Sequence, residues 1–146
     1  MNPVVSKKLL GVLLFFCCLI WVVSCSTPSE TRVKNVLFCI GDGMGISQIT
    51  APRIYLQGAD GRFNIEKMPV TGLVTTHSAD QLITDSAAGA TAMATGHKTR
   101  NGIIGLSADS LMLYTILEAS RDKGLATGLI ATSSVTHATP ACFARR

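Results

Sequence analysis

The feature that most constrains this chain is a run of small residues that begins at a serine. Residues 84–99 read T-D-S-A-A-G-A-T-A-M-A-T-G-H-K-T. Alanine has the highest helix propensity, so we expect residues 87–94 to form a helix with little side-chain bulk. Asp85 or Ser86 is expected to cap it, because each side chain can accept a hydrogen bond from a backbone N–H of the first turn. The lack of bulk lets another backbone or a ligand approach closely.

Ser86 lies where this expected helix begins, and there the free N–H groups and the helix dipole favour an anion. That position suits a phosphate, or a serine oxygen that attacks one. A capped helix packed in a core explains the same residues without chemistry. The G-x-S-x-G frame of a serine hydrolase is absent, because Thr84 replaces the first glycine and Gly89 comes three residues after the serine. We therefore expect a metal ion, rather than a paired histidine, to activate Ser86.

A carboxylate follows the first apolar segment of the chain. Residues 35–40 (N-V-L-F-C-I) are rich in strand formers and end in G-D-G-M-G, which places Asp42 directly after a predicted buried strand. Ligands bind at the carboxyl ends of strands in open α/β sheets. The glycines do not fit G-x-G-x-x-G, and an acidic side chain repels a pyrophosphate, so a cation is the better partner for Asp42. A glycine-rich turn without function is the alternative.

A third polar group follows the predicted strand 125–132. His137 and Thr139 are two residues apart on the loop after this strand and can face one site. Pro140 fits the first position of a helix, with Thr139 as its N-cap. Capping alone explains Thr139, and a single loop histidine is usually a surface residue. The functional interpretation gains weight because all three polar sites follow strands or open helices.

Taken in order, these motifs resemble a known family. G-D-G-M-G, the long run around Ser86, N-G-I-I-G at residues 101–105 and T-H-A-T-P-A at residues 136–141 occur in the order seen in bacterial alkaline phosphatases. The resemblance covers residues 33–146. It implies an α/β fold, an alkaline-phosphatase-like sheet with helices on both faces, incomplete in this chain. It also implies a homodimer that hydrolyses phosphate monoesters with two zinc ions (Zn2+) and one magnesium ion (Mg2+).

The same resemblance implies a role for each matching residue. Asp42 would bridge one zinc ion and the magnesium ion, and Ser86, close to that zinc, would be the nucleophile that is phosphorylated during turnover. Thr139 would bind magnesium. His137 stands where relatives carry Asp or His beside the magnesium, either as a direct ligand or behind one. The N-G turn at residues 101–102 matches a family turn without an assigned catalytic role.

Family members run several times longer than this chain. Their remaining metal ligands and the arginine that holds the substrate phosphate would follow Arg146, so we expect the chain to be roughly an N-terminal third, inactive by itself. Two alternatives remain. A related phosphodiesterase or sulfatase usually has Thr or a modified Cys at the nucleophile position, which the run around Ser86 disfavours. A non-catalytic truncated periplasmic lipoprotein is the other.

The first 25 residues resemble a bacterial secretion signal. Lys7 and Lys8 precede an apolar run from Leu9 to Val23, which is short for a membrane span. The V-V-S-C sequence ending at Cys25 resembles a lipobox, so Cys25 is expected to carry lipid in an exported periplasmic or outer-membrane lipoprotein. Ordinary signal-peptide cleavage near Cys25, with Cys25 as an unmodified thiol, is the alternative. Residues 26–32 are a polar linker. Without the two lysines the formal charge falls from +4 to +2, which gives no nucleic-acid signature.

Elsewhere, helical and extended patterns alternate. Residues 47–56 and 110–123 are predicted to be helices, the second amphipathic and ending at Gly124. Residues 70–76 are predicted to be a strand with Leu73 and Val74 in the core. This alternation favours an α/β sheet with parallel neighbours. Spacing alone does not decide whether Cys39 and Cys142 pair.

Overall fold

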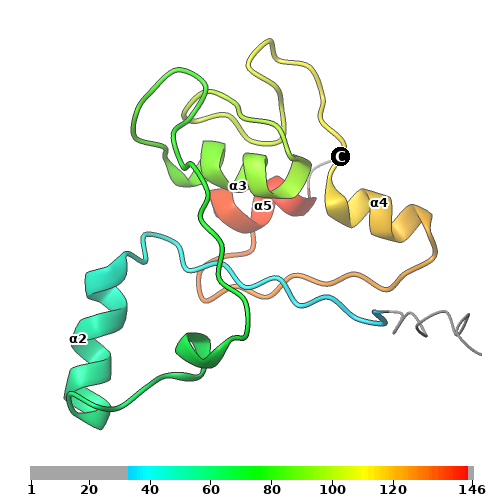
Figure 1. Ribbon diagram of the computed structural model, residues 1–146. Coiled ribbons are helices and arrows are strands. Elements are labelled where there is room, and N and C mark those ends of the chain that lie inside the picture. The colour runs from blue at the N-terminus through cyan, green and yellow to red at the C-terminus, as the bar shows by residue number, and fades with distance from the viewer. Residues whose placement is uncertain (1–32, 145–146) are drawn as a thin grey trace, which may run out of the picture. The chain divides into compact units, whose positions relative to one another are not determined.

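The computed structural model describes residues 33–144. The predicted signal and linker, with Cys25, lie outside the described residues. The chain divides into two units, and residues 33–39, extended and exposed, are the described part of the first. The second unit starts at Ile40 and holds the helices α2 (Ile46–Gln57), η1 (Asn64–Lys67, a 3-10 helix), α3 (Ser86–Thr95), α4 (Ile116–Asp122) and α5 (Ala138–Ala144) (Figure 1). Within residues 33–144, none of these helices has the length and apolar character needed to cross a membrane.

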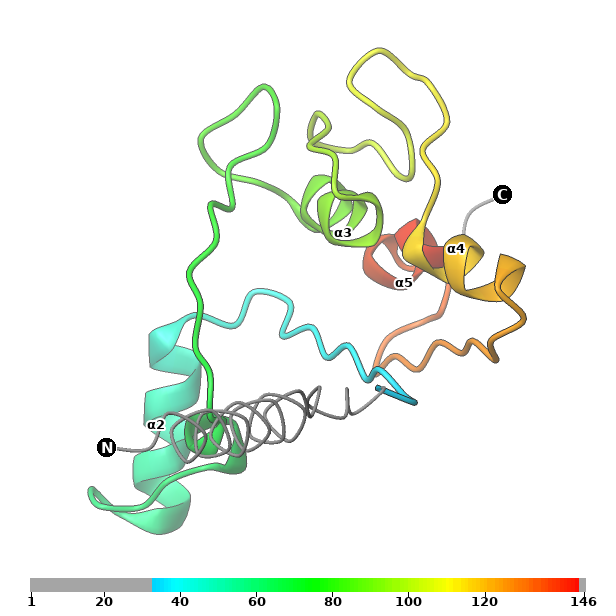
Figure 2. The ribbon, with the colours of Figure 1, turned by 45° about the vertical axis from the view of Figure 1, so that its right-hand side comes forward.

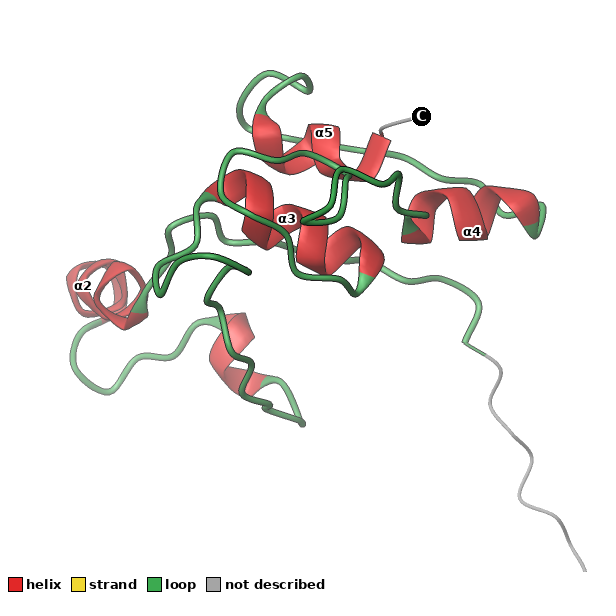
Figure 3. Cartoon of the chain, turned by 90° about the horizontal axis from the view of Figure 1, so that it is seen from above, coloured by secondary structure: helices red, strands yellow, loops and turns green. Residues whose placement is uncertain are grey.

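The packed core of the second unit lies between α3 and α5, with α4 beside them (Figures 2 and 3). Ala90 and Ala94 of α3 are buried against Cys142 and Phe143 of α5. Small side chains on α3 allow this close approach, as the alanine-rich run predicts. The partly buried side chains around this core are Ile40, Ile104, Leu117 and Leu129.

The predicted strands are not formed in the part of the chain that the structure describes. Residues 35–40, 70–76 and 125–132 lack strand pairing, and the described residues contain one isolated antiparallel bridge, between Leu106 and Met112. Leu73 and Val74 are fully or largely exposed, so their placement in the core is wrong. A strand exists only through hydrogen bonds to a neighbouring strand, and these segments have no such neighbour among residues 33–144.

The helix predicted over residues 110–123 is shorter than expected. Ser110 has a φ of 64°, and the N–H of Leu111 donates to the hydroxyl of Ser107, so the chain turns before the helix. Thr115 is the N-cap: its hydroxyl accepts from the N–H of Glu118 at 3.2 Å, and the Glu118 carboxylate accepts from the N–H of Thr115 at 2.8 Å. This reciprocal T-x-x-E capping pair begins a helix at the next residue. Gly124 follows the C-cap with φ 74°, as predicted.

Candidate active site

Asp42 lies on a tight turn after Ile40. The N–H of Met44 donates to the carbonyl of Gly41 at 3.3 Å, and Gly43, the third residue of the turn, has a φ of 64°. A positive φ at this position belongs to a type II turn and favours glycine. The turn leaves the Asp42 side chain exposed, with both carboxylate oxygens available to groups from elsewhere in the chain.

Ser86 is the first residue of α3. Asp85 is its N-cap, because Oδ1 of Asp85 accepts the N–H of Ala88 at 2.8 Å. Of the two predicted caps, the structure therefore uses Asp85, and the hydroxyl of Ser86 is left for another partner. That hydroxyl donates to Oδ1 of Asp42 at 3.0 Å. The serine thus combines a helix N-terminus with a hydrogen bond to a carboxylate.

Thr139 reaches the same carboxylate from α5. Its hydroxyl donates to Oδ2 of Asp42 at 2.7 Å. The predicted N-cap role for Thr139 is wrong by two residues, because α5 begins at Ala138 and the carbonyl of His137 accepts the N–H of Ala141 at 3.0 Å. Thr139 and Pro140 are therefore the second and third helical residues. Pro140 is tolerated there because first-turn N–H groups have no helical partner.

Ser86 and Thr139 thus converge, from α3 and α5, on the carboxylate of Asp42. The pKa of the Asp42 carboxyl is lowered from its ordinary value, first by the hydrogen bond from Thr139 and then by that from Ser86. The charge of His137 lowers this pKa further, while burial acts in the opposite direction. Hydrogen bonds to the charged form favour ionisation, so Asp42 carries its negative charge throughout the neutral and alkaline range.

The three histidines of the chain do not gather around this carboxylate. His137 is exposed and acts on Asp42 through its charge. The ring Nδ1 of His97 lies 2.9 Å from the carbonyl of Thr95, just after α3, and that of His77 lies 3.0 Å from the carbonyl of Ser78. Among residues 33–144, no three His, Cys, Asp or Glu side chains are grouped to hold a metal ion.

The donors around Asp42 nevertheless fit part of a cation site. One carboxylate and two hydroxyl groups form an all-oxygen set, and magnesium binds through one or two carboxylates while keeping several waters. A zinc site commonly adds nitrogen or sulfur ligands, so Asp42 and Ser86 supply only part of one. The lowered pKa of Asp42 is consistent with such use, because a metal ligand must be deprotonated.

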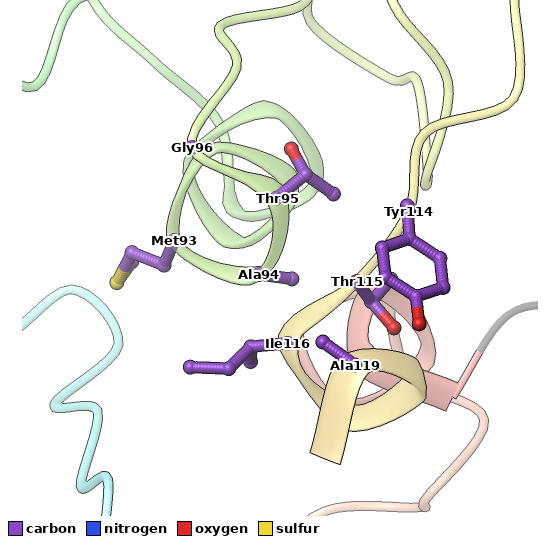
Figure 4. A pocket seen from close by; sticks show the side chains of 8 residues that line it. All are labelled: Met93, Ala94, Thr95, Gly96, Tyr114, Thr115, Ile116 and Ala119. Atoms are coloured by element: carbon purple, nitrogen blue, oxygen red, sulfur yellow. The ribbon is translucent and has the colours of Figure 1, made fainter. Parts of the chain in front are cut away.

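A shallow apolar cavity of about 290 Å³ lies elsewhere on α3. Figure 4 shows it between the last turn of α3 and the start of α4, lined by Met93, Tyr114 and Ile116 among others. Ser86 is at the opposite end of α3, about 14 Å away along the helix axis at 1.5 Å per residue. The cavity is therefore separate from the carboxylate site.

Hydrogen bonds that join Asn101 and Gly102 to Asp85 form a clamp behind Ser86. The sequence alone did not assign a role to this clamp. Asn101 and Gly102 bind the residue that precedes the serine: Oδ1 of Asn101 accepts the N–H of Asp85 at 3.1 Å, and the N–H of Gly102 donates to Oδ2 of Asp85 at 2.6 Å. The N-G pair indicates a turn, but its partners are 16 and 17 residues away. Only the fold brings them together.

The chain was also compared with known proteins. The family model described as alkaline phosphatase matches residues 33–146. The chain belongs to the alkaline phosphatase family.

Relatives with curated names are phosphatases of much greater length. Streptomycin-6-phosphate phosphatase of Streptomyces griseus is 45% identical over 124 residues, which are 81% of this chain and 27% of that protein. The alkaline phosphatase of Escherichia coli strain K12 is 44% identical over 122 residues, 79% of this chain and 26% of that protein. The chain therefore spans about a quarter of the length of these relatives.

Solved structures give the same family. Alkaline phosphatase from the Antarctic bacterium TAB5 has a TM-score of 0.63 and 42% identity, covering 70% of this chain and 29% of that chain. The cold-active enzyme of a Shewanella species has a TM-score of 0.65 and 37% identity, covering 71% and 27%. Variants of the Antarctic enzyme were solved with magnesium in a site called M3. The chain thus has an alkaline-phosphatase-like fold.

Proposed function

We propose that this chain supplies the nucleophile and part of the metal site of a phosphate-monoester hydrolase. Family membership supports the reaction class. The observation that carries the proposal is the hydrogen bond from Ser86 to Asp42 at the N-terminus of α3. The substrates are small phosphate monoesters, and the remaining metal ligands come from outside the described residues.

Ser86 attacks the phosphorus of the bound ester through its hydroxyl oxygen. The new Oγ–P bond forms as the bond from phosphorus to the ester oxygen breaks. The serine hydroxyl gives its proton to solvent water, and the departing ester oxygen takes a proton from water and leaves as the alcohol. The Asp85 side chain already accepts the N–H of Ala88, so the other N–H groups of the first turn of α3 would stabilise the negative charge of the transferred phosphate. Water then attacks the phosphoserine, releases phosphate and restores the serine hydroxyl.

The metal proposal assigns a task to each converging residue. Asp42 would be a shared ligand of one of two zinc ions and of a magnesium ion. Ser86, whose hydroxyl donates to Oδ1 of Asp42, would help to hold the zinc ion, and Thr139, whose hydroxyl donates to Oδ2, would help to hold the magnesium ion, with His137 beside it. When bound, zinc lowers the pKa of a hydroxyl and stabilises charge on the transferred group. The magnesium reported for the Antarctic variants supports a metal-dependent site in this family.

In the whole protein we propose a sheet in addition to the helices described above. The extended segments are expected to pair with further strands into an α/β sheet covered by helices on both faces, as in an alkaline-phosphatase-like domain over residues 33–146. We also propose an exported periplasmic or outer-membrane lipoprotein, anchored by lipid on Cys25, that forms a homodimer.

Replacement of the nucleophile tests the function. Residues 33–146 are built into Escherichia coli K12 alkaline phosphatase in place of the matching segment, and turnover of p-nitrophenyl phosphate is measured. Ser86→Ala should lower kcat by several orders of magnitude with zinc content unchanged, because only the attacking oxygen is lost. Ser47→Ala is the matched control, since Ser47 lies on α2 and its hydroxyl donates to the side chain of the neighbouring Gln48. Near-parental turnover by Ser86→Ala contradicts the assignment.

A further inference from the structure

The residues just before Ser86 are held by one asparagine side chain. Oδ1 of Asn101 accepts the N–H of Asp85 at 3.1 Å, and Nδ2 of Asn101 donates to the carbonyl of Ile83 at 3.0 Å. One partner is a donor and the other an acceptor, so the orientation of the amide is fixed by its partners. Neither an aspartate nor an alanine provides both groups.

Asp85 is held from its side chain as well as from its backbone. Its Oδ1 accepts the N–H of Ala88 inside α3, and its Oδ2 accepts the N–H of Gly102 at 2.6 Å. The backbone N–H and both carboxylate oxygens of Asp85 are thus engaged. Because Ser86 follows Asp85 directly, its Cα position is set by this residue and by the first turn of α3.

The asparagine is itself fixed in place. The N–H of Ile103 donates to the carbonyl of Arg100 at 3.2 Å, and Gly102 has a φ of 79°, which defines a type II turn with Asn101 at its second position. The N–H of Asn101 donates to Oδ1 of Asp80 at 3.2 Å, and the same oxygen accepts the hydroxyl of the buried Ser78 at 3.0 Å. The clamp therefore rests on a hydrogen-bonded turn and loop.

We propose that Asn101 is a positioning residue for the nucleophile. It holds Ile83 and Asp85 so that the oxygen of Ser86 stays beside Asp42, in line for attack. This inference rests on the proposed function of Ser86. A role in loop stability alone predicts lower stability with an unchanged turnover number per folded molecule. A positioning role predicts a lower kcat with the same KM, because a small displacement of a reacting group has a large effect on the rate.

The first measurement needs no turnover. Hydrogen exchange of backbone amides is followed in the full chain, purified in detergent because residues 9–23 are apolar. Asn101→Ala should make the Asp85 amide exchange about five- to ten-fold faster, since its acceptor is lost. Asn101→Asp keeps an acceptor oxygen for Asp85 but loses the donor to Ile83, so the Asp85 amide should stay closer to its wild-type rate. The control is Asn64→Ala on η1, with no change at Asp85.

The second measurement is steady-state turnover in the chimera described above. Asn101→Ala should lower kcat roughly 10- to 100-fold at unchanged KM and metal content. Asn101→Asp should also lose activity, because its second oxygen faces the carbonyl of Ile83. Asn64→Ala should match the parent.

The outcomes separate this inference from the proposed function. Wild-type exchange at Asp85 in Asn101→Ala overturns the clamp regardless of catalysis. Full kcat in Asn101→Ala, with Ser86→Ala inactive, overturns the positioning role while leaving the nucleophile in place. Turnover by Ser86→Ala overturns the proposed function itself.

Discussion

At the scale of single residues, Asp42 is stabilised as an anion by a hydroxyl on each oxygen. The bond from Thr139 is shorter than that from Ser86, 2.7 Å against 3.0 Å, and it is the larger cause of the lowered pKa of Asp42. A lowered pKa in the folded state means that the interaction stabilises the fold above the ordinary pKa of aspartate. That contribution is lost as the pH falls through the lowered value.

Removal of the Thr139 hydroxyl tests how strongly its hydrogen bond lowers the pKa of Asp42. Thr139→Val keeps the shape of the side chain, so in the metal-free chain the pKa of Asp42 should rise toward its ordinary value. An NMR titration of the side-chain carboxyl measures it. The difference in free energy of unfolding between wild type and variant should be largest near neutral pH. It should disappear as the pH falls through the lowered pKa of Asp42. Thr136→Val is the control, since its hydroxyl contacts Ser134. An unchanged pKa of Asp42 contradicts the reported hydrogen bond.

Sequence motifs predicted which residues lie together at the candidate site. They did not predict every contact that positions these residues. Asp42 and Ser86 stand out because each begins or ends an element within a recognisable motif. The start of α5 was predicted two residues too late, because the first helical hydrogen bond is accepted by the carbonyl of His137, a group that every residue has. Asn101 was passed over because its side-chain partners lie 16 and 18 residues away, a distance at which local patterns carry no information. The metal and catalytic roles of these residues stay predictions.

At the scale of elements, two helices bring the site together. Ser86 begins α3 and Thr139 lies in the first turn of α5, and these helices pack through Ala90 and Ala94 against Cys142 and Phe143. Alanine on α3 thus sets the spacing at which the two hydroxyl groups reach the same carboxylate. Packing and site geometry are coupled through this interface.

Enlargement of one buried alanine tests that coupling. Ala90 is 1% exposed, so Ala90→Leu should overfill the interface and lower the free energy of unfolding by about 1–3 kcal/mol. Urea denaturation measures the loss. The matched control is Ala51→Leu on the exposed face of α2, expected to have little effect. Equal stability of the two variants contradicts the packing of α3 on α5.

Elements were predictable where their signals are local. The alanine-rich run and the Asp85 cap predict α3, and residues 47–56 predict most of α2. The capping pair of Thr115 and Glu118 was available in the sequence and gives the true start of α4. Strands depend on pairing with distant segments, so an apolar pattern such as residues 70–76 does not by itself establish one.

At the scale of the whole molecule, large apolar side chains remain exposed in the extended segments. Leu73 and Ile130 are fully exposed, and Val70 is 83% exposed. Apolar surface of this kind marks an interaction face or an aggregation hazard. The relatives are about four times as long as the matched part, which supports the proposal that further strands cover these side chains.

The proposed lipid anchor belongs to this scale too. The apolar run before Cys25 predicts that Cys25 becomes an N-terminal diacylated residue, and two acyl chains give stable membrane attachment where one gives marginal binding. Cys25→Ser should abolish the lipid mass and move the protein from the membrane fraction to the soluble one. Mass spectrometry of the mature N-terminus distinguishes the lipid-modified form from the unmodified one. The matched control is Cys39→Ser, an exposed free thiol, and an unmodified wild-type N-terminus at another residue contradicts the anchor.

We propose that Ser86 forms a covalent bond to phosphorus during turnover. The most direct measurement is acid quenching of the chimera while it hydrolyses a phosphate monoester, followed by mass spectrometry of the peptide that contains Ser86. We expect one phosphate on Ser86 in the active protein and none in Ser86→Ala, whose turnover is lost. Continued turnover without phosphate on Ser86, or phosphate on a different residue of the active chimera, would contradict it.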